Sequence, residues 1–273
     1  MRKILSLIIV MRPHNVAAAV LSVAVGFAMT GSTHWPWLVF AAAAFATAAG
    51  NTINDIYDVD IDRVNKPRRP LAAGALSINA AIGLYAFFFA ASVLLMLLLP
   101  GNAALWIAVW IVLLHIYSWR LKRMYLAGNI LVSVVAGSGF LLGAYAGGNV
   151  MAGAIPAAFA FFFVMGREIV KDTDDIEGDR QCRARTFPIV SGRRAALTAA
   201  LAIFLALCIS IPVPSFAGIY GTAYALIMLL GVVPILLISI GIILKGRSLG
   251  TVSALLKIGM FLGCIAFYFG PPR

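Results

Sequence analysis

The stretch Asn51-Thr-Ile-Asn-Asp-Ile-Tyr-Asp-Val-Asp-Ile-Asp62 places four carboxylates at the end of a long apolar run. A second acidic segment runs from Glu168 to Asp179, and the two segments together hold all ten acidic residues of a chain that is 62% hydrophobic. Carboxylates are costly near a lipid bilayer and are rarely kept there without a function. The two segments are therefore the first candidates for a functional site.

Both acidic segments share one spacing. The first set is Asn51, Asp55, Asp58 and Asp62, and the second is Glu168, Asp172, Asp175 and Asp179. At about 100° of rotation per residue, each set would fall within roughly a 60° arc of one helix. By the same rotation, Asp60, Asp174 and Glu177 point away from these arcs. The repeat predicts two facing helices that hold hard divalent cations between them.

The composition excludes a soluble globular domain. Mean hydropathy is +0.99 and only 11% of the residues are charged, against about 25% in soluble domains. Most apolar spans are close to the ~20 residues that cross a hydrocarbon core. The sequence therefore predicts an all-α, multi-pass bundle of nine transmembrane helices, at about 14–31, 36–57, 78–99, 103–119, 126–146, 150–170, 194–212, 217–243 and 251–270. Residues 2–12 are expected to form an interfacial helix, with a retained signal anchor as the alternative.

The cations predict the orientation in the membrane. Nineteen of the 21 Lys and Arg residues lie in the N-terminal segment or near the ends of even-numbered spans. By the positive-inside rule, the N-terminus and these ends face the cytoplasm. Both acidic segments would then lie at the cytoplasmic ends of helices 2 and 6. We expect one domain, residues 1–273, with possible duplicated halves at about 14–122 and 126–247 and a ninth helix at 251–270.

Two acidic helix ends suit Mg²⁺, which takes oxygen ligands and is commonly shared with substrate phosphates. Cations beside such metals favour a diphosphate, whose charge exceeds what the metals cancel. The alternative for any single cation is a role in topology or in lipid headgroup contact. A diphosphate at the mouth of an apolar bundle predicts an isoprenyl diphosphate substrate. The candidate diphosphate-binding residues are Lys66, Arg69, Tyr117, Lys122 and Lys171.

Two stretches resemble the UbiA superfamily of intramembrane prenyltransferases. The first aspartate-rich motif of that family is similar to Asn54-Asp55-x2-Asp58-x3-Asp62 and the following Arg63-Val-Asn-Lys66-Pro67-Arg68-Arg69-Pro70-Leu71, and the second to Lys171-Asp172-x2-Asp175-Ile-Glu-Gly178-Asp179. The resemblance implies that Asn54, Asp58, Asp175 and Asp179 bind Mg²⁺-diphosphate, with Asp55, Asp62 and Asp172 in support. It also implies a diphosphate contact for Lys122.

Within the superfamily, both motifs most resemble the digeranylgeranylglyceryl phosphate synthases. That resemblance implies transfer of a geranylgeranyl group from its diphosphate to a lipid-phosphate acceptor. Asp58 and Asp175, which lie on the two shared arcs, are the candidate catalytic carboxylates. An alcohol acceptor must lose a proton as it bonds, so a base helps. Glu168 is the candidate base, with pairing to a neighbouring cation as the alternative.

The expected partners are the two substrates and membrane lipids. No nucleic acid partner is expected. Prenylation of aromatic quinone or chlorophyll precursors is one alternative function, and a secondary transporter is another.

Overall fold

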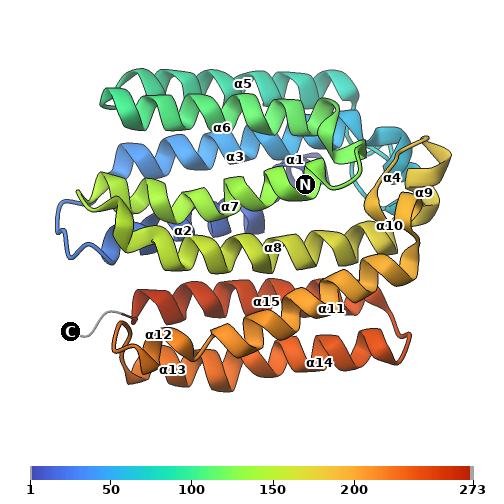
Figure 1. Cartoon of the computed structure of the whole chain (residues 1–273). Helices are drawn as coiled ribbons and strands as arrows, with labels where there is room; N and C mark the ends of the chain where they lie inside the picture. Colours follow the sequence, from blue (N-terminus) through green and yellow to red (C-terminus); the bar gives the residue numbers. More distant parts are fainter. Residues whose placement is uncertain (1, 271–273) are drawn as a thin grey trace. The chain divides into compact units, whose positions relative to one another are not determined.

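The computed structural model describes residues 2–270, with the side chains of residues 5–270. Helices and turns make up this part of the chain, and it contains no strand (Figure 1), which confirms the all-α prediction. The α-helices are α1 Arg2–Val10, α2 Pro13–Ala28, α3 Trp37–Tyr57, α4 Val59–Asn65, α5 Ile78–Leu97, α6 Gly101–Trp119, α7 Ala127–Ala146, α8 Ala154–Asp174, α9 Ile176–Gln181, α10 Phe187–Ser191, α11 Arg193–Ser210, α12 Val213–Phe216, α13 Thr222–Ile227, α14 Val233–Leu244 and α15 Leu249–Tyr268. Short 3₁₀ turns are η1 Leu121–Arg123 and η2 Val150–Gly153, and η3 Met228–Val232 is a π-helical turn.

Seven helical stretches in the described part are long and apolar enough to cross a membrane. They correspond to the predicted spans from 78–99 onward. The predicted spans 14–31 and 36–57 are also helical, as α2 and α3. However, α2 has only 16 residues, and α3 carries the polar residues of the first acidic segment at its end. The structure therefore supports seven apolar spans, and nine remains a prediction.

The chain divides into two compact units. The first contains the chain up to Leu21, Trp35–Leu131 and Glu177–Thr186, and the second contains Ser22–His34, Val132–Ile176 and the chain from Phe187 on. The second acidic segment is thus divided, because its last residues from Glu177 belong to the first unit. The predicted duplication into two halves stays a prediction.

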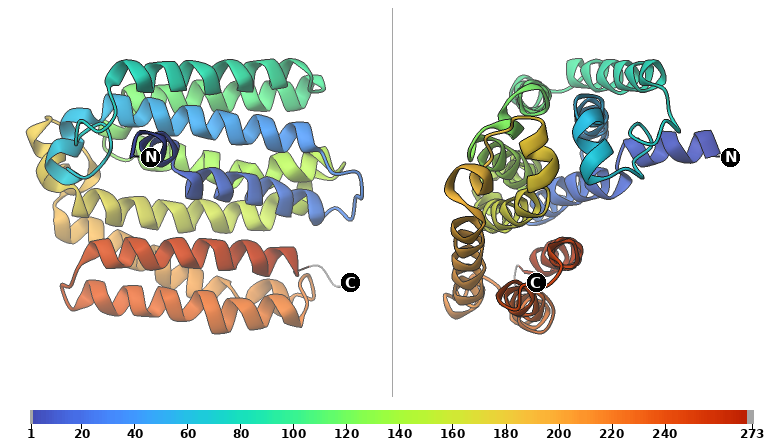
Figure 2. Two further views of the ribbon diagram at one scale, coloured as in Figure 1. Left: turned by 180° about the vertical axis from the view of Figure 1, so that it is seen from behind. Right: turned by 90° about the vertical axis from the view of Figure 1, so that its right-hand side faces the viewer.

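In the first unit, α3 packs against α5 and α6 (Figure 2). Small side chains on α3 allow this packing, since Ala48 and Ala49 are buried against Phe88 of α5. A second apolar cluster joins α1 and the loop after α4 to α4 and α5, through Val10, Val59, Leu71, Leu76 and Ala81. These two clusters fix the end of α3, where the first acidic segment lies.

In the second unit, α8 packs against α11 and α15, and α14 packs against α15. Backbones approach closely where α7 meets the end of α2. A Cβ atom on Gly143 would lie 1.8 Å from the carbonyl oxygen of Val23, and one on Gly26 would lie 2.0 Å from that of Phe140. Small residues permit such contact between membrane helices. These glycines are therefore required by space.

Gly143→Ala should destabilise the protein by about 1–3 kcal/mol or more, the usual cost of overpacking. Gly263→Ala is the matched control, because a Cβ there meets nothing within 4 Å. Both changes replace a helical glycine and share the same gain in helix propensity. Thermal unfolding in detergent should show a lower apparent Tm for Gly143→Ala alone. Equal Tm values for the two variants would contradict the close helix contact.

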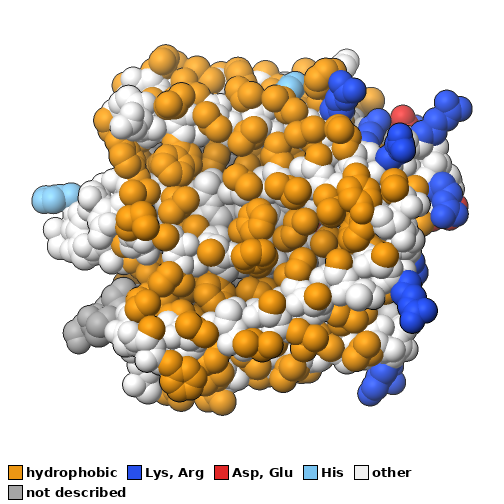
Figure 3. Space-filling model, viewed as in Figure 1, with side chains coloured by type: hydrophobic (Ala, Val, Ile, Leu, Met, Phe, Trp, Pro, Cys, Tyr) orange, Lys and Arg blue, Asp and Glu red, His pale blue; other side chains and the backbone are white. Residues whose placement is uncertain are grey.

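The outer faces of the helices are apolar. In Figure 3 hydrophobic side chains cover most of the visible faces along the helices, and the visible Lys and Arg side chains lie at helix ends. Among the exposed residues, Leu94 and Leu97 of α5 and Leu105 of α6 are each more than 60% exposed. Large apolar faces of this kind mark contact with lipid or protein, and together with the seven apolar helices they indicate an integral membrane protein.

Candidate active site

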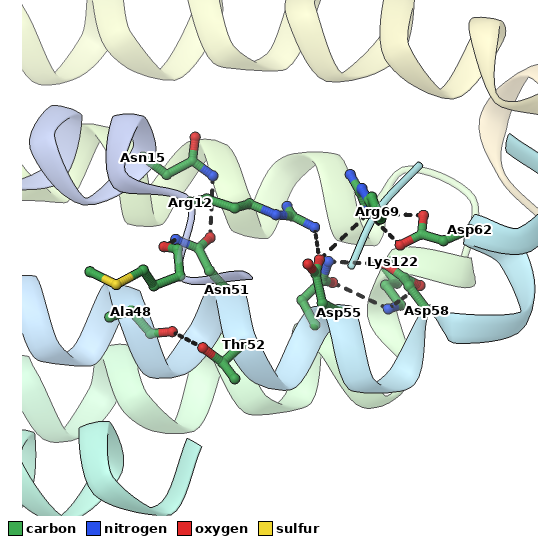
Figure 4. Close-up of polar contacts among 12 residues, drawn as sticks. Arg12, Asn15, Ala48, Asn51, Thr52, Asp55, Asp58, Asp62, Arg69 and Lys122 are labelled. Carbon is green, nitrogen blue, oxygen red and sulfur yellow. Dashed lines mark hydrogen bonds and ion pairs between the residues drawn. The ribbon is translucent and has the colours of Figure 1, made fainter. Parts of the chain in front are cut away.

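The first acidic segment does not lie on one helix. Helix α3 ends at Tyr57, Asp58 has φ −95° and ψ 0°, and α4 begins at Val59. The prediction that one continuous helix carries all four residues of the first set is therefore wrong. Arg69 nevertheless contacts the carboxylates of both Asp55 and Asp62, which shows that these two side chains lie close together (Figure 4).

Asp58 is the centre of a buried polar contact. Its Oδ1 lies 2.5 Å from Nζ of Lys122, and its Oδ2 accepts a hydrogen bond of 2.9 Å from Nδ2 of Asn54. Lys122 also donates to Oδ1 of Asn54 at 3.2 Å. Lys122, in η1, is separated from Asn54 by 68 residues. The structure thus brings together three of the predicted site residues.

Two arginines bind the other carboxylates of the first segment. Arg12 contacts Oδ1 of Asp55, and Arg69 lies 3.5 Å from the same oxygen. Arg69 Nη1 also donates to Asp62, at 2.6 Å to Oδ2 and 2.9 Å to Oδ1. Asp55 and Asp62 are each buried. Arg12, Asp55, Arg69 and Asp62 therefore form a charged network next to the Asp58 contact (Figure 4).

Burial shifts the pKa of Lys122 and of Asp62, and both residues lie outside the seven apolar helices. Burial lowers the pKa of Lys122, while the charge of Asp58 opposes that shift. Burial raises the pKa of Asp62, and Arg69 opposes it. Buried charges persist only with partners of opposite sign. The end of α3 is thus a place where the fold stabilises paired charge.

Asn51, the first member of the predicted set, lies in a different contact. Its Nδ2 donates to the carbonyl oxygen of Met11 at 2.9 Å, and its Oδ1 accepts from Asn15 at 3.2 Å. It fastens the segment between α1 and α2 to α3, which places Arg12 beside Asp55. The sequence prediction used Arg12 only for topology. The only feature of the sequence that marked Arg12 was that Arg12 and Pro13 interrupt the first apolar run.

In the second unit, α8 ends at Asp174 and Asp175 follows as its C-cap. The second set therefore does not occupy one continuous helix either, which corrects the same prediction. Asp172 and Asp175 are half-buried, and Asp174 is exposed as expected. Lys171 lies 3.6 Å from Asp172.

Glu168 is buried in α8 and contacts two cations. Arg167 donates to its Oε1, and Lys171 donates to its Oε2 at 3.2 Å. This is the pairing with neighbouring cations that the sequence left open as the alternative to a base.

The remaining predicted residues have definite positions. Asp179 follows the buried Gly178 in α9, within the first unit, and is half-buried. Lys66 caps α4 and Tyr117 lies near the end of α6, and both are half-buried. Asp60 is exposed and pairs with Arg63, as expected for a residue off the site.

The donor set at the end of α3 fits Mg²⁺. Within residues 5–270, no three or more His, Cys, Asp or Glu side chains are grouped to hold one metal ion. Magnesium commonly needs only one or two carboxylates together with substrate phosphates and water. Asp58 and the amide oxygen of Asn54 offer such oxygens, and Lys122 already brings a positive charge to them.

Two curated proteins with similar sequences carry the same name. The digeranylgeranylglyceryl phosphate synthase of Methanothermobacter thermautotrophicus is 37% identical over 269 residues, which cover 96% of this chain and 94% of that protein. The synthase of Natronomonas pharaonis is 37% identical over 275 residues, which cover 99% and 98%. Both alignments extend over nearly the full length of each chain.

Solved structures share the fold. One from work on digeranylgeranylglyceryl phosphate synthase in membranes is 30% identical, has a TM-score of 0.73 and covers 99% of each chain. A UbiA homologue from Archaeoglobus fulgidus, bound to GPP and Mg²⁺, has a TM-score of 0.66 at 21% identity and covers 95% of this chain. The model of the UbiA prenyltransferase family matches residues 17–265. The chain therefore belongs to the UbiA prenyltransferase family.

Proposed function

We propose that this prenyltransferase moves a geranylgeranyl group from its diphosphate to the free hydroxyl of geranylgeranylglyceryl phosphate, with Mg²⁺ required. The observation that carries the proposal is the contact of Asp58 with Lys122 and Asn54 at the end of an apolar helix. Two relatives at 37% identity over nearly the whole chain bear the name of that synthase. The homologue bound to GPP and Mg²⁺ supports the same class of donor and metal.

The residues of the first unit have separable tasks in this reaction. Asn54, Asp58 and Asp179 supply oxygen ligands, with Asp55 and Asp62 in support. Lys122 and Arg69 offset the charge of the diphosphate. When bound, Mg²⁺ would neutralise charge on the leaving diphosphate as its bond to the allylic carbon breaks.

The apolar helices hold the prenyl chain and keep water from the allylic cation. The hydroxyl oxygen of the acceptor forms the ether bond to that carbon, and its proton passes to a base. Glu168 is the candidate base, although Arg167 and Lys171 already bind its carboxylate. Its participation would require at least one of these contacts to open.

Mass spectrometry of the products tests the acceptor. Purified protein in lipid, given Mg²⁺, geranylgeranyl diphosphate and a panel of acceptors, should produce a doubly alkylated glyceryl phosphate. A prenylated phenol or quinone precursor as the sole product would overturn the acceptor and leave the prenyltransferase assignment intact. Transport of an ion with no prenylated product would favour the transporter alternative.

We also propose that the site faces the cytoplasm of a cell membrane, because the basic residues lie near the ends of even-numbered predicted spans. In a variant without native cysteines, a cysteine at Ser77 or Arg247 should react with an impermeant thiol reagent only from the cytoplasmic side. A cysteine at Ser32 or Asn102 should react only from outside. Labelling of position 32 from the cytoplasm would contradict this orientation.

A further inference from the structure

Asn65 joins the two acidic segments of the chain. It is the last residue of α4, and its Oδ1 accepts a hydrogen bond of 2.9 Å from the backbone N–H of Gly178. The contact spans 113 residues of sequence and lies wholly within the first unit. Asn65 thus connects the end of the first acidic segment to the residue just before Asp179.

Gly178 is shaped to this contact. A Cβ atom there would lie 2.5 Å from Nδ2 of Asn65 and 2.6 Å from both its Cγ and its Oδ1. Gly178 is absent from the glycines with positive φ, so its backbone does not itself demand glycine. A side chain at position 178 would have to displace the Asn65 side chain, and with it the hydrogen bond.

A second contact fastens the other end of the same segment. The N–H of Arg185 donates to the carbonyl oxygen of Arg123 at 2.8 Å. Arg123 in turn donates through Nη2 to the carbonyl oxygen of Tyr57 at 3.0 Å, one residue before Asp58. The segment Glu177–Thr186 is therefore tied at both ends to the elements that carry Asp58 and Lys122.

We infer that Asn65 is a positioning residue, which holds Asp179 in register with Asp58 and Asp62 and so sets the affinity of the site for divalent metal with a diphosphate. This inference rests on the proposed function. Loss of a residue that orients a metal ligand typically costs 10–100-fold in metal affinity, and small misplacements in a site can cost about 10²-fold in rate. We expect an effect of this order from Asn65→Ala.

Two readouts other than turnover test the inference. The first is Mn²⁺ binding, followed by electron paramagnetic resonance in the presence of geranylgeranyl S-thiolodiphosphate, a slowly ionising donor analogue. The second is amide hydrogen exchange of the peptide that contains Gly178. Asn65→Ala should weaken Mn²⁺ binding about 10–100-fold and speed the exchange. Asn65→Asp keeps a hydrogen-bond acceptor and should keep the Gly178 amide protected from exchange. Val64→Ala, at an exposed site on the same helix, should behave as wild type.

The double variant makes the test specific. Gly178→Ala should also weaken Mn²⁺ binding, because its Cβ meets the Asn65 side chain. With Asn65 replaced by Ala, that clash is removed, so Asn65→Ala/Gly178→Ala should bind no worse than Asn65→Ala. The inference would be overturned if the losses of Mn²⁺ affinity added up in the double variant, or if Asn65→Ala kept wild-type Mn²⁺ affinity. The proposed function would stand in both cases. If the wild-type protein binds no Mn²⁺ with the analogue, the proposed function fails, and the inference fails with it.

Discussion

Asp58→Asn should lower kcat/KM by about 10²–10³-fold, the usual cost of removing one group that stabilises developing charge. The carboxylate is buried and contacts Lys122 and Asn54. Asparagine keeps the shape of the side chain but loses the charge that a divalent metal needs. The measurement is initial rate against donor concentration at saturating Mg²⁺.

Asp60→Asn is the matched control, two residues further along the chain. Its side chain is 83% exposed and pairs only with the exposed Arg63 among the contacts described. Exposed pairs contribute little, so the variant should keep nearly wild-type kcat/KM. The apparent Tm of both variants separates loss of chemistry from loss of folding. Equal damage from the two substitutions would contradict the assignment of Asp58 to the site.

Lys122→Met should have the next largest effect, a loss of about 10²-fold in kcat/KM. The side chain of Lys122 is only 9% exposed and lies between Asp58 and Asn54. Methionine retains much of the apolar volume and removes the charge that would offset the diphosphate. Rates with varied geranylgeranyl diphosphate would show the loss, and Lys122→Arg should recover only part of it, since the planar guanidinium does not replace a compact ammonium.

Arg120→Met is the control for Lys122, because Arg120 is exposed just before η1. It removes the same charge from the same loop and should leave the rate nearly unchanged. If the two methionine variants lose activity equally, the cations of this loop act in topology or at lipid headgroups, and Lys122 has no special place in the site.

Helix positions were predictable because long apolar runs leave the chain few alternatives. The predicted span 78–99 corresponds to α5 at Ile78–Leu97, and 126–146 to α7 at Ala127–Ala146. The helix breaks at Asp58 and Asp175 were not predicted. The spacing of the carboxylates fits a continuous helix, and neither break is marked by proline or glycine. A local rotation rule cannot detect a break at such positions.

Some positions at the end of α3 were predictable because the residue type carried the signal. The buried positions of Asp55, Asp58 and Asp62 follow from carboxylates grouped at an apolar helix end. The contacts of Arg12 and Asn65 were not predictable in this way, because each is made with a partner more than 40 residues away. Tertiary contacts of that range leave no periodic pattern in the sequence.

Paired measurement of pyrophosphate and ether lipid tests the central claim most directly. Wild-type protein in lipid, with geranylgeranyl diphosphate and geranylgeranylglyceryl phosphate, should release one pyrophosphate for each ether bond formed when Mg²⁺ is present. Addition of EDTA should abolish both products. Two results would contradict the account. One is ether lipid formed without divalent metal. The other is pyrophosphate released together with the prenyl alcohol and no ether lipid.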